Sequence, residues 1–582
     1  MCRTQPEIGY AHRFDQMQIL RQREVYDVCV VGSGAGGGMA AMVLTQAGAR
    51  VALLEAGPMW DTARDGRMFA WPYDSPRRGG PTPDRPYGEF DGAIGGWQID
   101  GEPYTVAPQS SFRWFRARML GGRTNHWGRI SLRFGPDDFR RRSLDGLGDD
   151  WPIGYDDLKP YYDRLDTLIG VFGSAEGLTN EPDGIFQPPP KPRCYELLVK
   201  SACDRLGIRC IASRLSILTQ PLNGRAACHY CGQCNRGCAT RSNFSTPSVL
   251  LPPALATGRL RIIPNAMARH VTTDERGVAT GVTFIGTRDG RPGHIRARIV
   301  VLAASACETA RLLLNSRTSR FPQGLGNSSG KVGRFLTDTT KPTNIHGYIP
   351  RLAANVPHNE DGVGGGHLYM PWWLEGRKLD FPRAYHIELS SGSGRQMPGY
   401  GFMSDIDQYG VSGYGKSLKD AYRKHYGAVL TFLPRGEMIP NNDSWCELDR
   451  ATVDRFGIPV LRFHFKHSVH EVNQAKHMVD TCHEIIDAMG GTPLHTLPGN
   501  DKYSLQVGGS TNHEVGTTRM GTDPESSVVD RYCGLHDVRN VFVADGGPFV
   551  SNPEKNVTWT ILALAFRTAE HIVDERRRGN LP

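Results

Sequence analysis

At 582 residues the chain is too long for one simple hydrophobic core, and its length predicts two interleaved domains. Its 39% hydrophobic and 22% charged residues are typical of a globular protein. A net charge of +8 without Lys/Arg blocks argues against a nucleic-acid-binding protein. Apolar runs such as residues 299–304 are too short to cross a bilayer, so we expect no transmembrane helix.

The first predicted unit is a β-α-β arrangement near the N-terminus. Residues 25–31 form an apolar β-type run, residues 39–46 have the pattern of a helix, and residues 50–54 form a second run that ends on Glu55. The turn after the first run has G-x-G-x-x-G spacing, through Gly32, Gly34 and Gly37. Such glycines let a pyrophosphate approach the helix N-terminus, and an acid placed like Glu55 binds an adenosine ribose hydroxyl. The unit predicts a dinucleotide site; a glycine-rich loop without a ligand is the alternative.

The middle of the chain mixes irregular and regular segments. Residues 60–110 are rich in Pro, Gly and aromatic residues and lack periodicity, which predicts a covering loop. We expect a helix over residues 156–168 with Asp156 as its N-cap, and an extended connector over the proline-rich residues 182–192. Further expected elements are strands at 260–263, 281–285 and 299–302, helices at 308–314 and 472–489, and alternating strands and loops from 341 to 500.

Four cysteines form the most specific motif of the chain. Cys228, Cys231, Cys234 and Cys238 have C-x2-C-x2-C-x3-C spacing, which matches the iron–sulfur run of bacterial ferredoxins except that Ala239 replaces the following proline. Short spacers let the thiolates converge on one small cluster. In ferredoxins the fourth cysteine serves a second cluster, and no second run exists here. The motif therefore predicts a four-iron cluster on all four cysteines or a three-iron cluster on three of them.

Other interpretations of these cysteines stay open at this point. Structural zinc is one, although zinc pairs usually come as two well-separated C-x2-C units. Disulfides or free thiols are another. The other nine cysteines are scattered, which argues against a disulfide framework and for folding in a reducing compartment.

A further constellation lies near the C-terminus. Residues 513–521 carry His513, residues 541–544 form a predicted strand leading to Asp545 and Gly546, and Asn556 begins a predicted helix that runs to about residue 574. A helix N-terminus directed at a flavin would stabilise its anionic reduced form. The plainer alternatives are that Asn556 is only an N-cap and that His513 is a packed core histidine.

These motifs occur in the order and spacing of the glucose–methanol–choline (GMC) flavin oxidoreductases, which the chain resembles from about residue 25 to 573. The resemblance rests on the first glycine turn, residues 121–127 (Gly-Gly-Arg-Thr-Asn-His-Trp), residues 513–521, the Asp545–Gly546 turn and residues 556–558. The family's Asn-Pro-Thr is Asn-Val-Thr here, which keeps the asparagine. The chain is most similar to the sugar-oxidising branch, which includes bacterial sugar dehydrogenase large subunits and glucoside 3-dehydrogenase.

The resemblance implies an α/β fold, in which a Rossmann-like FAD-binding domain is interleaved with a substrate domain built on a mostly antiparallel sheet, as in p-hydroxybenzoate hydroxylase. It places the FAD-binding domain at residues 20–60, 105–140, 255–335 and 505–582. A flavin-covering loop is expected at 61–104, a helical and Cys-rich segment at 145–254, and the substrate-binding domain at 336–504.

The resemblance also implies roles for individual residues. His513 matches the catalytic base and Asn556 the second active-site position, which would hold the substrate oxygen. His126 matches a histidine that carries covalent FAD in pyranose 2-oxidase; the alternatives are a role in shaping the loop or packing against the flavin, or neither. The implied FAD-binding residues are Gly32, Gly34, Gly37, Glu55, Gly121, Gly122, Asn125, His126, Asp545, Gly546, Asn556 and Thr558.

The activity implied is an FAD-dependent dehydrogenase. It would oxidise a secondary hydroxyl of a sugar or glycoside, with C3 favoured, transfer hydride to flavin N5 and pass electrons out through the Cys-ligated iron–sulfur cluster. The alternatives are an oxidase that uses O2 with a structural Cys run, a catalytically silent electron-transfer subunit, and an enzyme for sterols or long-chain alcohols.

Partners and location are also expected only from the resemblance. Similar large subunits are exported folded with a small partner that carries a twin-arginine signal, and they pass electrons to a cytochrome or another acceptor. We therefore expect a periplasmic protein with such a partner. The sequence itself shows no export signal, which alone would indicate the cytoplasm.

Overall fold

The computed structural model describes residues 24–66, 68, 70, 92–343, 345–353, 362–391, 414–425, 427–494 and 503–582. Its first layer is a seven-stranded sheet of order β10-β11-β12-β1-β2-β9, with β20 also paired to β12. The pairs among β12, β1, β2, β9 and β20 are parallel, whereas β10 and β11 are antiparallel additions. The strands are β1 (Val25–Val31), β2 (Val51–Leu54), β9 (Leu260–Ile263), β10 (Ala266–Thr273), β11 (Ala279–Gly286), β12 (Pro292–Leu302) and β20 (Val541–Val543).

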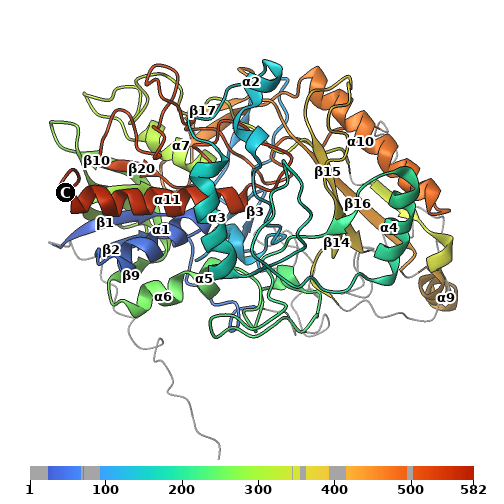
Figure 1. Ribbon diagram of the computed structural model, residues 1–582. Helices are drawn as coiled ribbons and strands as arrows, with labels where there is room; N and C mark the ends of the chain where they lie inside the picture. The colour runs from blue at the N-terminus through green and yellow to red at the C-terminus, as the bar shows by residue number, and fades with distance from the viewer. Residues whose placement is uncertain are drawn as a thin grey trace, which may run out of the picture.

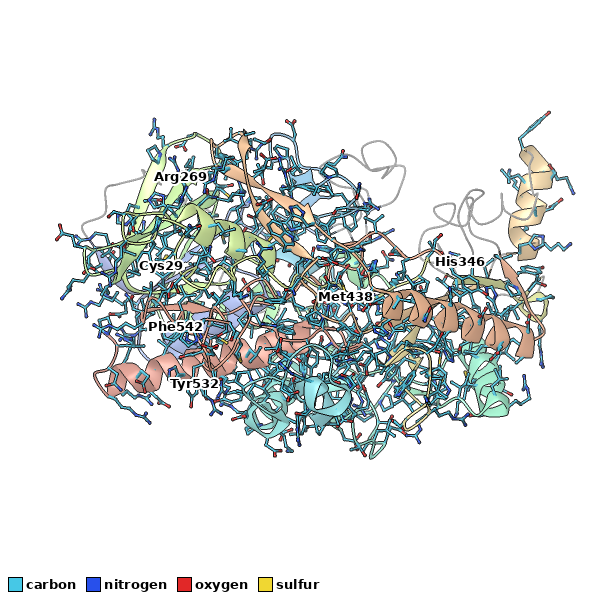
Figure 2. The ribbon with its side chains drawn as sticks, turned by 90° about the horizontal axis from the view of Figure 1, so that it is seen from above. Cys29, Arg269, His346, Met438, Tyr532 and Phe542 are labelled. Carbon is cyan, nitrogen blue, oxygen red and sulfur yellow. The ribbon has the colours of Figure 1, made fainter. Side chains whose placement is uncertain are left out.

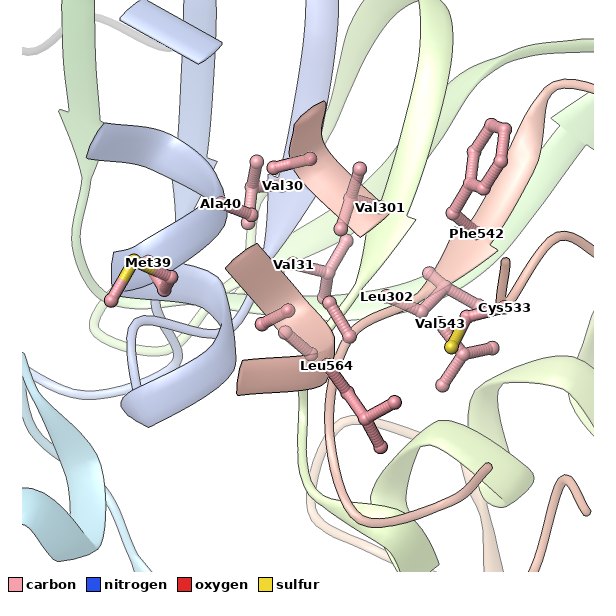
Figure 3. Close-up of a cluster of buried hydrophobic side chains, with 14 of the residues drawn as sticks. Val30, Val31, Met39, Ala40, Val301, Leu302, Cys533, Phe542, Val543 and Leu564 are labelled. Carbon is pink, nitrogen blue, oxygen red and sulfur yellow. The ribbon is translucent and has the colours of Figure 1, made fainter. Parts of the chain in front are cut away.

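Two helices cover this sheet and form its core. Helices α1 (Ala35–Gln46) and α11 (Thr558–Arg577) run side by side (Figure 1). Their buried side chains meet the sheet in one apolar cluster, in which Val30 and Val301 face Ala40 and Leu564 (Figure 3). Strands that are buried on both faces have continuous apolar runs. The parallel strands of the first sheet could therefore be predicted from the local sequence. The predicted β-α-β unit is therefore present, with the helix starting four residues earlier than expected.

A second sheet forms the other half of the molecule. Its order is β19-β13-β16-β15-β14-β8, and every pairing is antiparallel, as expected for the substrate side. Helices α4 (Cys194–Leu206) and α10 (Val469–Ala488) lie beside it at the end of the molecule away from α11 (Figure 1). The strands are β8 (Ile211–Ala212), β13 (Ile345–Tyr348), β14 (Leu368–Met370), β15 (Tyr385–Ser391), β16 (Val429–Gly436) and β19 (Thr492–Leu494).

The two faces of this second sheet differ sharply. In β15 and β16 the side chains of Tyr385, Ile387, Leu430 and Phe432 enter an apolar cluster that also contains α10 residues. Because successive residues of a strand point to opposite faces, the residues between them lie on the other face. That face carries His386, Glu388, Thr431 and Arg435. His386, Glu388 and Thr431 are buried, so this polar face is directed at the rest of the molecule and not at solvent.

The segments of the two halves are interleaved along the chain. The first sheet takes strands from residues 25–54, 260–302 and 541–543, whereas the main strands of the second come from 345–494. Met438 lies two residues after the end of β16 and bridges to Asn552, and it lies between Cys29 of the first half and His346 of the second (Figure 2). The exact domain limits stay a prediction. Within the described ranges we find no helix with the length and apolar character needed to span a membrane.

The remaining elements complete the fold. They are β3 (Gly95–Gly96), β4 (Thr105–Val106), β5 (Arg116–Ala117), η3 (Gly122–Asn125), η4 (Pro136–Phe139), α2 (Arg141–Asp145), α3 (Tyr155–Ile169), β6 (Val171–Phe172), β7 (Phe186–Gln187), η5 (Cys234–Arg236), α5 (Thr246–Val249), α6 (Leu251–Ala256), α7 (Ala306–Asn315), η6 (Pro350–Leu352), α9 (Gly415–His425), β17 (Trp445–Val453) and β18 (Pro459–His464).

Two expected helix caps are wrong. Helix α3 is capped by Gly154, whose backbone N–H is bonded by Asp157, so Asp156 lies inside the helix. Helix α11 begins at Thr558 with Val557 as its N-cap, so Asn556 lies outside it. In both cases a polar residue suited to a cap lies one or two positions from the true helix end. Most of the expected covering loop, residues 71–91, lies outside the described part of the chain.

Candidate active site

The first glycine turn is shaped for close contact with a ligand. Gly32 has φ +94°, and a Cβ there would lie 2.3 Å from the carbonyl oxygen of Ala303. A Cβ on Gly37 would lie 1.9 Å from the Gly32 carbonyl oxygen, so this glycine packs the helix against the turn. By contrast, a Cβ on Gly34 would meet no heavy atom within 4 Å. The turn therefore leaves open space at the N-terminus of α1, where a pyrophosphate binds in such motifs.

Glu55 ends β2 and is tied to this turn. Its carboxylate accepts hydrogen bonds from the Ser33 hydroxyl at 2.5 Å and from the Gly57 N–H at 2.8 Å. The Ser33 hydroxyl in turn accepts from the Gly121 N–H at 2.8 Å. Burial raises the pKa of Glu55. Ser33, which sequence reasoning did not single out, thus joins the adenosine-side acid to the second glycine motif.

These segments enclose one large cleft within the first half of the molecule, at the ends of β1, β2 and β12. Its empty volume is about 1270 Å³, with the open mouth included. The predicted residues that line it are Gly32, Gly34, Glu55, Gly122, Asp545, Gly546 and Thr558. The predicted residues outside its lining are Gly37, Gly121, Asn125, His126, His513 and Asn556.

The motif at residues 121–127 folds into a tight turn beside the cleft. The fully buried Asn125 donates from Nδ2 to the carbonyl oxygens of Leu120 and Gly122, at 2.9 and 3.1 Å, and so holds the turn. His126 packs against the ring of Phe115, and within the described residues its buried Nε2 has no hydrogen-bond partner. Burial, then Arg129, lowers the pKa of His126 to about 3. Trp127, the next residue, lines the cleft itself.

The turn after β20 closes the cleft from the C-terminal side. Asp545 accepts from the Thr309 hydroxyl at 2.6 Å and from the Gly547 N–H at 2.8 Å. Burial raises its pKa to about 6 despite these two hydrogen bonds. The carboxylate therefore fixes the chain direction just before Gly546 contributes to the lining of the cleft.

His513 lies at the junction of the two halves. Its Nδ1 is 2.7 Å from the Thr339 hydroxyl, and its backbone N–H donates to Asp338 at 2.9 Å. In the tautomer where Nδ1–H donates to Thr339, Nε2 is left as an acceptor, which is what a general base needs. Burial, then the charge of Arg435, lowers the pKa of His513 to about 3. The imidazole is therefore neutral at physiological pH.

Asn556 offers an amide without a structural task. It is buried, and its Oδ1 has no hydrogen-bond partner among the described residues. It does not cap α11, as noted above. Leaving such a group unpaired is costly, about 1–3 kcal/mol, so this amide is suited to bind a ligand. The preceding Lys555, which the sequence did not mark, is held in a buried cluster with Asp138 and Glu554.

The four cysteines lie together at a second, smaller cavity. All four line it, with Met68 and Asn243 among its other residues. The Sγ of Cys228 accepts from the Tyr230 N–H at 3.3 Å, and that of Cys234 from the Gly364 N–H at 3.4 Å. Within the described ranges no group of three or more His, Cys, Asp or Glu side chains is arranged to hold a metal ion. Every cysteine in those ranges is a free thiol.

Comparison with known proteins identifies the family. The N-terminal model of the family described as GMC oxidoreductase matches residues 35–340, and its C-terminal model matches residues 440–565. The chain belongs to the GMC oxidoreductase family. It is therefore an FAD-dependent oxidoreductase that acts on CH–OH groups.

Relatives extend over almost the full chain. The chain is 32% identical to 2-methyl-1,2-propanediol dehydrogenase of Mycolicibacterium austroafricanum, over 94% of this chain and 95% of the relative. It is 30% identical to paromamine 6'-oxidase of Streptomyces fradiae (98% and 95%) and 27% identical to the fructose dehydrogenase large subunit of Gluconobacter japonicus (95% and 98%). The crystal structure of pyridoxine 4-oxidase from Mesorbium loti shares the fold, with a TM-score of 0.63 at 16% identity, over 94% of this chain and 99% of that one.

Proposed function

We propose that this GMC oxidoreductase is a dehydrogenase that oxidises a secondary hydroxyl of a sugar or glycoside, with C3 favoured, to a keto-sugar. The observation that carries the proposal is the buried polar face of the second sheet next to His513. Glu388 accepts from Arg435 Nε at 2.7 Å and lies 3.1 Å from His386 Nε2. These groups are near enough to His513 to shift its pKa.

Such a buried polar face suits a substrate with many hydroxyl groups. A sugar replaces the water lost on binding with hydrogen bonds to these side chains, whereas a sterol or long alkyl chain would leave them unpaired at a cost of about 1–3 kcal/mol per group. The relative that is a fructose dehydrogenase supports a sugar substrate. The relative that acts on 2-methyl-1,2-propanediol supports a second candidate, a small polar diol.

Separate residues of the chain carry out the separate steps of the proposed reaction. FAD, once bound, supplies the hydride acceptor. Neutral His513 accepts the proton of the substrate hydroxyl at Nε2, and the Asn556 amide holds the substrate oxygen in place. The Thr339 hydroxyl fixes the orientation of the imidazole.

We further propose that Cys228, Cys231, Cys234 and Cys238 hold an iron–sulfur cluster, which would supply one-electron transfer. The shared cavity and the two N–H···S contacts support this proposal, because hydrogen bonds to the sulfurs tune such clusters.

The two cavities are joined by a short contact path. Trp127 lines the cleft and donates from Nε1 to the Phe244 carbonyl oxygen at 3.2 Å, and the adjoining Asn243 lines the cysteine cavity. This supports electron transfer between the two sites. A small partner subunit, a cytochrome-type acceptor and periplasmic residence complete the proposal, and the fructose dehydrogenase relative, a large subunit, supports the partner.

The proposal is tested by incubating the purified protein with methyl glucoside and an artificial electron acceptor, with the product followed by NMR and the iron content measured in parallel. We expect a 3-keto product, bound iron and little O2 consumption. Stoichiometric O2 consumption without iron would instead favour the oxidase.

A further inference from the structure

Lys341 lies between the catalytic histidine and the polar sheet face. The segment that carries it bridges to the His513 segment at Thr337–Val515 and to the end of β16 at Thr340–Gly436. Its Thr339 contacts the His513 ring, and the Lys341 carbonyl oxygen accepts from the Gln506 N–H at 2.8 Å. The backbone of Lys341 is therefore fixed within the junction that also fixes His513.

Lys341 and His513 face the same ion pair. Arg435 and Glu388 are the strongest charged influences on both side chains, and Asp338 acts on Lys341 as well. The two functional groups thus approach one point of the molecule from neighbouring segments.

The amine of Lys341 has no protein partner in the part of the chain that the structure describes. Glu388 is already bonded by Arg435 and faces His386, and Asp338 accepts from the backbone N–H groups of His513 and Thr511 at 2.9 and 3.1 Å. Burial, then the charge of Arg435, lowers the pKa of Lys341 to about 7.

Two other cations of this protein, by contrast, are paired with carboxylates. Arg123 binds Glu514, and Lys555 lies against Asp138 and Glu554. Lys341 is half-buried, and even partial desolvation of an amine without an acceptor is costly, so this group is suited to bind a molecule from outside the chain. Its position beside His513 makes the substrate the natural acceptor.

We propose that Lys341 is a substrate-binding residue, whose amine holds a hydroxyl on a carbon next to the one oxidised. The proposal rests on the proposed function, because it requires a substrate with neighbouring hydroxyl groups. It adds a specificity element to the site: Lys341 selects sugars and vicinal diols over alcohols with a single hydroxyl.

The test compares Lys341→Met, Lys341→Arg and, as a control, Lys419→Met, which changes an exposed lysine of α9. The holoenzymes are assayed with methyl glucoside and with its 2-deoxy and 4-deoxy analogues. We expect Lys341→Met to lower kcat/KM for methyl glucoside about tenfold or more, mainly through KM, as loss of a hydrogen bond to a charged group does. Lys341→Arg should recover part of this loss, and Lys419→Met should match wild type.

The analogues separate binding from a structural role. If the amine holds a substrate hydroxyl, one deoxy analogue lowers kcat/KM in wild type but adds little in Lys341→Met. Equal losses on all substrates, or no loss at all, would overturn the proposal.

Failure of the proposed function gives a different result. If wild type oxidises no sugar, the same variants are assayed with 1,2-propanediol and 2-propanol. A loss confined to the diol supports Lys341 and leaves the sugar proposal wrong. An enzyme that oxidises only 2-propanol overturns both the Lys341 proposal and the sugar proposal.

Discussion

At the scale of single residues, the environment of His513 determines how the reaction responds to pH. Burial and Arg435 lower its pKa to about 3, so the imidazole stays neutral, and able to accept a proton, as the pH falls well below the usual histidine value of about 6.5. We therefore expect no acid limb from His513 between pH 5 and 7 in the rate of flavin reduction. Two neighbouring groups titrate near the upper end of this window: Asp338, whose pKa burial and Glu514 raise to about 7, and Lys341, whose pKa burial and Arg435 lower to about 7. An acid limb near pH 6.5 that persists in both Asp338→Asn and Lys341→Met would contradict the prediction.

Removing the imidazole tests its role directly. His513→Gln should slow anaerobic flavin reduction about 100- to 10,000-fold, the usual contribution of a general base. Because His513 does not line the large cleft, the flavin content and its absorbance should stay as in wild type. Stopped-flow absorbance measures the rate, and a variant that loses FAD would show that the residue is instead needed for cofactor binding.

Two glycines of the first glycine motif, Gly34 and Gly37, should lose different properties when each is changed to alanine. Gly34 has φ −66° and faces open space, so Gly34→Ala should fold normally but fill the space for the pyrophosphate and lower the FAD content. Gly37→Ala would place a Cβ 1.9 Å from a backbone oxygen and should reduce soluble yield and thermal stability. Flavin absorbance per protein and the melting temperature distinguish these outcomes. Normal FAD content in Gly34→Ala would contradict the placement of the cofactor.

At the scale of elements, a buried charge cluster holds the start of α11. Lys555, 1% exposed, lies 3.0 Å from Asp138 and 2.5 Å from Glu554, and it directly precedes Asn556. Removing one partner of a buried pair costs about 3–5 kcal/mol, so Lys555→Met should lower the denaturation midpoint clearly, whereas Lys419→Met should not. Equal midpoints for the two variants would show that the cluster does not stabilise this junction.

Local sequence patterns predicted the helices and strands whose apolar periodicity is visible within a short window of the chain. The β1-α1-β2 unit and α10 follow from apolar periodicity, which the chain displays within a short window. The polar face of the second sheet could not be predicted. His386, Glu388 and Arg435 come together, and near residue 513, only through the pairing of strands that are distant in sequence. Lys341 has no motif around it, and its unpaired state is visible only once its neighbours are known. The cap of α11 was misjudged because asparagine fits a cap and a ligand site equally well.

At the scale of the whole molecule, the protein joins two cavities with separable tasks. Cys234 lies at the small cavity and away from the large cleft, so Cys234→Ser should lose bound iron while it keeps its FAD. Anaerobic reduction of the flavin by substrate should continue, but transfer to a protein acceptor should slow. Iron analysis and acceptor assays measure the two effects. A variant with unchanged iron, or a wild type without iron, would contradict the proposed cluster.

The central claim is that an alcohol with many hydroxyl groups is oxidised at His513, beside the polar face of the second sheet. It is tested most directly by anaerobic visible spectra of the purified protein after addition of methyl glucoside or of 1-octanol. The account predicts that the glucoside bleaches the flavin band and that octanol leaves it oxidised. Bleaching by octanol, with the glucoside inert, would contradict it.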